Sequence, residues 1–261
     1  MIYKIFFSTV LLVILMSGVA VKAADVTYVP ESIQEMDWIR LLKYVPRPTP
    51  PAETTPPIDP SRPMIALTFD DGPSRYTLQI LDVLVENNSS ATFFAVGNRV
   101  NMYPQIVERI HNQGSEVAGH SWDHSRLTRL PQDEIRRQIL QTHSAIEAIT
   151  GPMTKFFRAP FGSYNGTVTQ VAEELGFSLI QWSVDPRDWE TRNADAIFNA
   201  VYERVKDGDI VVLHDLLPTT ANAMERLIPS LIARGFQLVT VSDLLYFRGL
   251  EMMPGGVYYS V

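Results

Sequence analysis

An alternation of short apolar runs with longer amphipathic stretches, repeated seven times after residue 63, constrains the fold of this chain more than any other feature. The apolar runs are rich in β-branched, aromatic and aliphatic side chains, which is typical of buried strands. They cover residues 64–69, 91–96, 116–119, 155–158, 177–184, 209–214 and 236–241. A stretch of helical periodicity follows each run, at 77–87, 104–113, 131–150, 167–175, 194–206, 221–234 and 242–247. Strands that alternate with helices lie parallel, so the pattern predicts an α/β fold, either a barrel or an open doubly wound sheet.

The beginning of the chain differs in composition from the rest. Residues 5–21 carry no charge, lie between Lys4 and Lys22, and are followed by the small residue Ala23. This arrangement is typical of a secretory signal peptide covering residues 1–23, and a short uncleaved membrane anchor is the alternative. In both cases we expect the remainder of the chain to be secreted or held in the cell envelope.

A proline-rich segment separates this leader from the apolar runs. Residues 46–63 contain 8 of the 18 prolines of the chain, and such a segment favours an extended conformation without internal hydrogen bonds. We therefore assign residues 24–63 to an N-terminal segment that ends in a stiff linker. Residues 64–261 are assigned to one folded domain.

Two features of the composition exclude classes of function. The 22 basic and 29 acidic side chains give a net charge of −7, and nucleic-acid binders carry a basic surface, so we expect no nucleic-acid partner. Cysteine is absent, which excludes disulfides, thiolate metal ligands and a cysteine nucleophile. A metal ion would have to be bound by histidine, aspartate or glutamate.

Five of the predicted strands end in clusters of polar residues. The clusters are Asp70-Asp71-Gly72-Pro73-Ser74, His120-Ser121-Trp122-Asp123-His124, Arg158-Ala159-Pro160-Phe161-Gly162, Asp185-Pro186-Arg187-Asp188-Trp189 and His214-Asp215. In parallel α/β folds the carboxyl ends of the strands form the face that binds ligands. Each cluster alone has a structural interpretation, for example as a turn or a strand cap. Together they predict one site that contains carboxylates, imidazoles and a guanidinium.

Histidine is concentrated at these strand ends. Three of the five histidines, His120, His124 and His214, follow predicted strands, whereas His111 and His143 fall inside predicted helices and are assigned to surface or packing. The spacing of His120 and His124 can direct two imidazoles toward one ion, and a solvated helical face is the alternative. Two imidazoles with a carboxylate would form a three-ligand site with an open position, as in catalytic zinc sites.

The five clusters, in this order, resemble the motifs of the polysaccharide deacetylases, which are carbohydrate esterase family 4 and share the NodB-homology domain. The resemblance covers about residues 64 to 247. It implies a distorted (β/α)7-type barrel of parallel strands and metal-dependent removal of N-acetyl groups from a polysaccharide. Two positions depart from the family pattern, because Val212 stands where leucine is usual and Ala159 where proline is frequent.

The resemblance also implies roles for the residues of the first three clusters. Asp71, His120 and His124 would hold one divalent metal ion, which is usually zinc. Asp70 would be the general base, and Arg158 would orient it.

For the last two clusters and their surroundings, the resemblance implies an acid and a substrate pocket. His214 would be the general acid, with the carboxylate of Asp188 behind it. The Phe161 N–H would bind the oxyanion, and Trp189 would form a wall of the acetyl pocket. The full set of expected substrate-binding residues is Phe161, Tyr164, Trp189 and Val212.

The motifs leave the substrate open. We favour N-acetylglucosamine in peptidoglycan, because an exported enzyme on a stiff linker would reach the wall, and chitin-like oligomers fit the same motifs. One alternative is an O-acetyl esterase that acts on xylan-type glycans, since the same machinery can attack either carbonyl. The other is a non-catalytic cell-wall-binding module with the same fold, which the presence of both Asp70 and His214 disfavours.

Overall fold

The computed structural model describes residues 57–153 and 155–261. The predicted signal segment 1–23 and the predicted linker up to residue 56 lie outside the described residues. None of the helices in the described part of the chain is long and apolar enough to cross a membrane.

A single sheet forms the centre of the described part of the chain. It has eight strands, which are β1 (Met64–Asp70), β2 (Thr92–Ala95), β3 (Glu116–Gly119), β4 (Phe156–Phe157), β5 (Ser178–Ile180), β6 (Ile210–His214), β7 (Gln237–Leu238) and β8 (Val257–Tyr258). Their order is β6-β1-β2-β3-β4-β5-β8, with β7 paired to β1, and every pair is parallel. The first seven strands lie within the predicted runs or extend them by one residue, and β8 is additional.

The sheet curls until strands from its two edges meet. Val184, which follows β5, makes a parallel bridge with Val211 of β6. The Val184 N–H donates to the carbonyl of Ile210 at 3.2 Å, and the Val212 N–H donates to the carbonyl of Val184 at 3.0 Å. This bridge and an antiparallel one between Asp209 and Ser260, which follows β8, connect the two ends of the sheet. The fold is therefore the distorted β/α barrel that the family resemblance implied.

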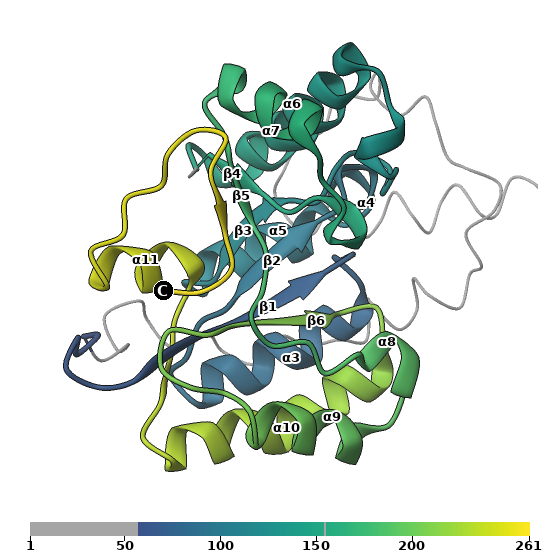
Figure 1. Cartoon of the computed structure of the whole chain (residues 1–261). Helices are drawn as coiled ribbons and strands as arrows, with labels where there is room; N and C mark the ends of the chain where they lie inside the picture. Colours follow the sequence, from purple (N-terminus) through teal and green to yellow (C-terminus); the bar gives the residue numbers. More distant parts are fainter. Residues whose placement is uncertain (1–56, 154) are drawn as a thin grey trace, which may run out of the picture. The chain divides into compact units, whose positions relative to one another are not determined.

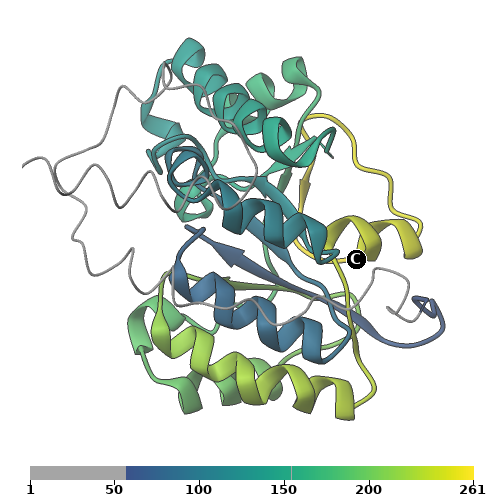
Figure 2. The same cartoon turned by 180° about the vertical axis from the view of Figure 1, so that it is seen from behind.

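The helices pack on the outside of the sheet. In Figure 1, α3 (Arg75–Glu86), α9 (Ala194–Tyr202) and α10 (Pro218–Ala233) lie together on one side, and α6 (Gln132–Thr150) and α7 (Gly166–Leu175) lie on the other. Figure 2 shows α3 beside α10 from behind. Because β1 is covered on both faces, all seven of its residues are buried. The remaining elements are the helices α4 (Gly97–Met102), α5 (Pro104–Asn112), α8 (Asp188–Thr191) and α11 (Val241–Phe247), and the 3-10 turns η2 (Leu127–Arg129) and η3 (Pro160–Gly162).

Several element boundaries differ from the sequence prediction. The run predicted at 177–184 forms a strand of only three residues, and Val184 rejoins the sheet further along through its bridge to Val211. Helices α4 and α8 were not predicted, since six and four residues are too few to show a helical period. The strand β8 has two residues and gives no alternation signal either.

The last residues of the predicted linker contact the barrel. The Asp59 N–H donates to Oε1 of Gln237 at 2.8 Å, and Nε2 of Gln237 donates to the Asp59 carbonyl at 2.7 Å. Arg248 donates to the carbonyl of Pro60 at 2.9 Å, and Ile58 packs against the core. These contacts hold residues 58–60 against the amino end of the sheet, at β7.

Candidate active site

The polar strand ends line one pocket of about 440 Å³ at the carboxyl ends of the strands. Arg158 and Asp188 are fully buried and bond to residues of the pocket from behind. Tyr164 is not part of the lining. Its hydroxyl is hydrogen-bonded to the Tyr259 hydroxyl at 2.8 Å. Eight of the eleven predicted site residues line the pocket, namely Asp70, Asp71, His120, His124, Phe161, Trp189, Val212 and His214.

The three predicted metal ligands come together on one side of the pocket. Oδ1 of Asp71 lies 3.0 Å from Nε2 of His124 and 3.4 Å from Nε2 of His120. One potential ligand atom from each residue lies within 4.8 Å of the other two, and among the described residues no other group of this kind occurs.

The chemistry of this cluster fits a divalent cation. Oδ1 of Asp71 is buried and makes no hydrogen bond within the described chain. Burial opposes ionisation of this carboxyl, but His120 and His124 hold its pKa well below the usual range. Nδ1 of His120 must donate a proton to the carbonyl of Arg158, 2.9 Å away, because a carbonyl only accepts. In the neutral imidazole this leaves the lone pair on Nε2, the atom that faces Asp71. A buried carboxylate oxygen without a hydrogen bond, close to the Nε2 atoms of two imidazoles, is the donor set of a metal site.

The two histidines reach this position through a strained loop. The helical interpretation of their spacing is wrong, because residues 120–126 form no helix. Ser121 and His124 both have φ 62, and Asp71 has φ 75, in the left-handed region that costs energy for residues with a side chain. Phe161 and Arg187 share this conformation, so five of the seven such residues in the described chain belong to the polar clusters.

Asp70 is held by a buried arginine. Arg158 is 0% exposed, and its guanidinium donates to Oδ1 of Asp70 at 2.7 Å and to the Thr68 hydroxyl at 2.7 Å. Its remaining donors bind the carbonyls of Ile180 and Gln181. These other contacts fix the guanidinium in place behind Asp70. Oδ2 of Asp70 lies 3.9 Å from Nε2 of His120 and faces the metal ligands.

His214 is held in the same way by a buried carboxylate. Nδ1 of His214 donates to Oδ1 of Asp188 at 2.7 Å. Oδ2 of Asp188 accepts from the His214 N–H at 2.8 Å and from the Thr220 hydroxyl at 2.7 Å. Burial lowers the pKa of His214, but the hydrogen bond and charge of Asp188 outweigh it and raise this pKa to about 9. The imidazole is therefore protonated at neutral pH. Sequence reasoning missed Thr220, because a single threonine within a helix belongs to no motif that would mark it as part of the site.

Exposed aromatic rings form the rim of the pocket. Phe161 is 56% exposed and Trp189 is 48% exposed. The Phe161 ring packs against His124 with centroids 4.7 Å apart. The Cζ atom of Arg126 lies 4.3 Å from the centroid of the Phe161 ring, and sequence reasoning did not single out this arginine. Exposed aromatic faces beside a polar centre are suited to contact with sugar rings.

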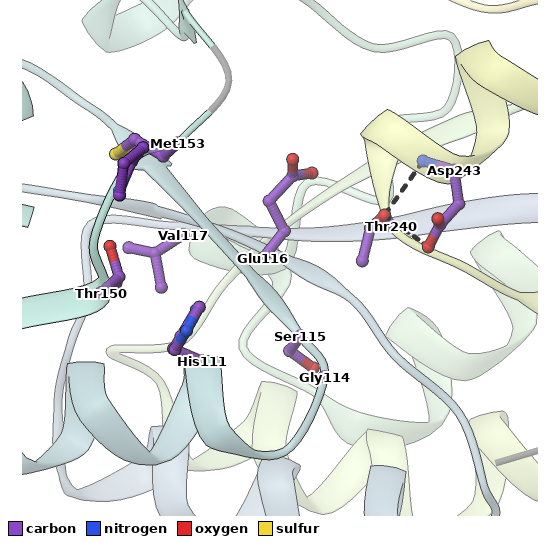
Figure 3. A pocket seen from close by; sticks show the side chains of 10 residues that line it. His111, Gly114, Ser115, Glu116, Val117, Thr150, Met153, Thr240 and Asp243 are labelled. Carbon is purple, nitrogen blue, oxygen red and sulfur yellow. Dashed lines mark hydrogen bonds between the residues drawn. The ribbon is translucent and has the colours of Figure 1, made fainter. Parts of the chain in front are cut away.

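A larger pocket, of about 640 Å³, lies at the amino end of β3 and has a different character (Figure 3). Its Thr240 and Asp243 cap the start of α11 and bond to each other. Glu116 accepts from the Thr92 hydroxyl at 2.9 Å and also from Ser242. These polar groups serve the structure, so volume alone does not identify the active site.

The pocket of this parallel barrel combines three potential metal ligands, a carboxylate held by an arginine and an imidazole held by a carboxylate. This combination is typical of a metal-dependent hydrolase. The chain belongs to the polysaccharide deacetylase family, carbohydrate esterase family 4. The family model "Polysaccharide deacetylase" matches residues 58–180. The members of this family generally depend on a metal ion.

Individual relatives support the family assignment. The chain is 41% identical to the peptidoglycan-N-acetylmuramic acid deacetylase PdaC of Bacillus subtilis, over 74% of this chain and 41% of that protein. The solved structure of PdaC superposes with a TM-score of 0.71 at 40% identity, covering 74% of this chain and 94% of the solved one. The chain thus spans well under half of the full length of PdaC.

Two further relatives have other named substrates. The chitooligosaccharide deacetylase of Sinorhizobium fredii is 37% identical, over 70% of this chain and 92% of that protein. The solved family 4 acetyl xylan esterase of Clostridium thermocellum, in complex with a cobalt ion, is 34% identical with a TM-score of 0.71. That comparison covers 76% of this chain and 98% of the solved one.

Proposed function

We propose that this protein removes N-acetyl groups from the amino sugars of peptidoglycan, with one divalent ion, zinc, held by Asp71, His120 and His124. The observation that carries the proposal is that Oδ1 of Asp71 is buried without a hydrogen bond between two imidazoles. A carboxylate and a protonated imidazole line the same pocket. The names of the relatives, which include peptidoglycan deacetylases, support the substrate.

The reaction is hydrolysis of an amide, and the chain supplies a base. A bound divalent ion would polarise the acetyl carbonyl and, in zinc enzymes, lowers the pKa of water from 15.7 to about 7. Asp70 accepts a proton from the attacking water through Oδ2, because Arg158 occupies Oδ1. The Phe161 N–H makes no hydrogen bond in the described chain, so it is free to donate to the developing oxyanion.

The second half of the reaction needs an acid. When the tetrahedral intermediate collapses, the C–N bond breaks and the nitrogen takes its electron pair. His214 donates a proton to this nitrogen, and the amine and acetate leave. The pKa of about 9 that Asp188 imposes keeps His214 protonated under neutral conditions.

Acetate release tests the proposal directly. Peptidoglycan, chitooligosaccharides and acetyl xylan should be compared with metal-free protein and after zinc is restored. We expect zinc-dependent acetate release, with peptidoglycan as the best substrate. Glycan binding without acetate release from any substrate would instead show a non-catalytic wall-binding module. Fastest release from acetyl xylan would show the O-acetyl esterase, the alternative that the cobalt-bound relative favours.

The choice of peptidoglycan also agrees with the location that we expect for the protein. We propose that the uncharged segment 5–21 directs export, as a cleaved signal or as an anchor. The part of the proline-rich segment that precedes residue 58 would then separate the barrel from the membrane or leader. An exported enzyme on a stiff linker would be placed to reach the cell wall.

The pH dependence of turnover should shift when Asp188 is replaced by asparagine. The raised pKa of His214 keeps the acid protonated up to about pH 9, so wild-type kcat should fall only as pH rises through this value. Asp188→Asn removes the negative charge that raises the pKa of His214, while burial still lowers this pKa. The alkaline limb of the kcat profile should therefore move toward pH 6.5 or below. A pH profile of kcat measures this shift. An unchanged alkaline limb would contradict the role of Asp188.

The raised pKa of His214 also predicts that the stability of the fold changes with pH. A raised folded-state pKa means that the His214–Asp188 pair stabilises the fold fully below about pH 6.5, the ordinary pKa of histidine. This contribution should disappear as pH rises toward 9. Thermal midpoints at pH 6 and pH 9.5 should therefore differ more in the wild type than in Asp188→Asn.

Arg126 offers a way to distinguish charged from neutral glycans. Among the described residues it pairs with no carboxylate, and it lies over Phe161 at the rim of the pocket. We expect it to attract the free carboxylates of the peptides that peptidoglycan carries. Arg126→Gln should lower kcat/KM on peptidoglycan about 5-fold, since an exposed ion pair contributes up to about 1 kcal/mol. Chitooligosaccharides, which are neutral, should be unaffected.

A nearby arginine provides the control for this measurement. Arg129 is exposed and lies three residues further along the chain. Arg129→Gln changes the net charge by the same amount but leaves Arg126 over Phe161 in place. It should therefore leave the ratio of the two activities unchanged. An equal loss on both substrates in Arg126→Gln would show that the arginine serves packing rather than charge recognition.

A further inference from the structure

Asp215 is a buried carboxyl group that the proposed reaction does not use. It follows His214 at the end of β6 and is 1% exposed. The described residues include no cation that forms an ion pair with it, although Arg99 is close enough to lower its pKa. A buried carboxyl without a cationic partner is costly and needs a structural or functional reason.

The contacts of Asp215 go to one segment, the turn that carries the first polar cluster. Oδ2 of Asp215 accepts a hydrogen bond from the Thr77 hydroxyl, and its backbone carbonyl accepts one from the Ser74 hydroxyl. Its N–H donates to the carbonyl of Asp70 at 3.3 Å. The Thr77 hydroxyl also accepts from the Ser74 N–H at 2.8 Å. Both ends of the turn 70–74 are therefore tied to Asp215.

The middle of the same turn is shaped by the carboxyl group of Asp215. A Cβ atom placed on Gly72 would lie 2.2 Å from Oδ2 and 2.4 Å from Oδ1 of Asp215. Because the φ angle of Gly72 is not in the left-handed region, space rather than backbone conformation requires glycine here. The carboxyl group and the glycine backbone thus fit against each other.

The residue before this glycine is the metal ligand Asp71, whose φ of 75 is unfavourable for a residue with a side chain. Such a conformation persists only where the surroundings hold it. Asp215 contacts the chain on both sides of Asp71, at Asp70 and at Gly72. It is thus placed to maintain the strained conformation.

We infer that Asp215 is a positioning residue that holds the turn 70–74 so that the carboxylate of Asp71 faces His120 and His124. Its loss should weaken metal binding without removing any ligand. The inference rests on the proposed function, because it assumes that these three residues bind a metal ion.

A neutral side chain of the same shape should serve almost as well. Oδ1 of Asp215 has no hydrogen-bond partner in the described chain, and burial raises the pKa of Asp215 to about 7 despite the Thr77 hydrogen bond. In Asp215→Asn the amide oxygen can still accept from the Thr77 hydroxyl. Asparagine is therefore the conservative replacement, and alanine is the disruptive one.

The test is calorimetric titration of zinc into the metal-free full chain. Asp215→Ala should weaken zinc binding about 10-fold, at the lower end of the effect of groups that support metal ligands. Thr77→Val, which removes only the bridging hydroxyl, should weaken it in the same direction. Asp215→Asn should retain most of the wild-type affinity.

Glu116→Gln is the matched control. Glu116 is also a buried carboxyl held by a threonine and a serine hydroxyl, but it lies at the opposite end of the sheet. Its replacement should lower the thermal midpoint of the metal-free protein and leave the zinc Kd unchanged.

Two results would overturn the inference. One is wild-type zinc affinity in folded Asp215→Ala and Thr77→Val proteins, and the other is an equal loss of affinity in Glu116→Gln. The wild-type titration and acetate assay test the proposed function separately. If wild-type protein binds zinc and releases acetate while the variants bind zinc equally well, only the role of Asp215 fails.

Discussion

Purified His120→Ala protein is expected to contain almost no zinc and to release acetate at least about 10⁴-fold more slowly than the wild type. The effect should exceed the 10²- to 10⁴-fold that is usual for loss of an acid or base, because without the ion neither carbonyl polarisation nor water activation remains. Three protein ligands are the usual minimum of a catalytic zinc site, so two do not retain it. Elemental analysis of the purified protein measures the metal directly.

Asp71 should behave in the same way, with one precaution in the choice of variant. Its φ of 75 is better tolerated by asparagine than by alanine, so Asp71→Asn separates loss of the ligand charge from added backbone strain. Asp71→Ala should lose metal completely, and Asp71→Asn should lose most of it. His111→Ala, which replaces an exposed histidine outside the site, should keep its zinc. Unchanged metal content in Asp71→Ala and His120→Ala would refute the ligand assignment.

Asp70→Asn and His214→Ala are expected to keep both the fold and the metal but to lose turnover by about 10²- to 10⁴-fold. Asparagine at position 70 can still accept a hydrogen bond from Arg158, which matters because an unpartnered buried guanidinium would cost about 3 to 5 kcal/mol of stability. Metal content, the thermal midpoint and kcat should be measured on the same preparations.

The substrate distinguishes the base from the acid in these variants. His214 is needed to protonate a leaving amine, whereas an activated acetyl ester has a leaving group that departs without a proton. His214→Ala should therefore lose much more activity on an N-acetyl glycan than on the activated ester. Asp70→Asn should lose activity on both, since both need attack by water. An equal loss on both substrates in His214→Ala would contradict its role as the acid.

Much of the fold was predictable from local patterns. The run that became β1 is buried along its whole length, and the run that became β6 is buried up to His214, so both sequences are continuously apolar. A strand covered on both faces gives this signal whatever its neighbours are. The polar clusters were also placed correctly at one face, because parallel strands have their carboxyl ends at the same side. The resemblance to one family then supplied the choice of a barrel.

Local patterns failed where tertiary contacts override them. The spacing of His120 and His124 is compatible with a helix, but the chain there is a loop in which Ser121 and His124 adopt left-handed conformations. No propensity predicts a conformation that is unfavourable by itself and is maintained by surrounding contacts. The hydrogen bond between the hydroxyls of Tyr164 and Tyr259, residues 95 apart in the chain, likewise has no local signal.

The sequence by itself determined which chemical groups are available and on which face of the sheet they emerge, because strand periodicity and parallel topology are local or general properties. Only the tertiary structure decided which of these groups touch. The Arg158–Asp70 contact joins residues 88 apart, and the Thr77–Asp215 contact joins residues 138 apart. Whether such contacts form depends on how the sheet curls and on which strained turns its packing can hold. These are properties of the whole fold, and no single segment of the chain specifies them.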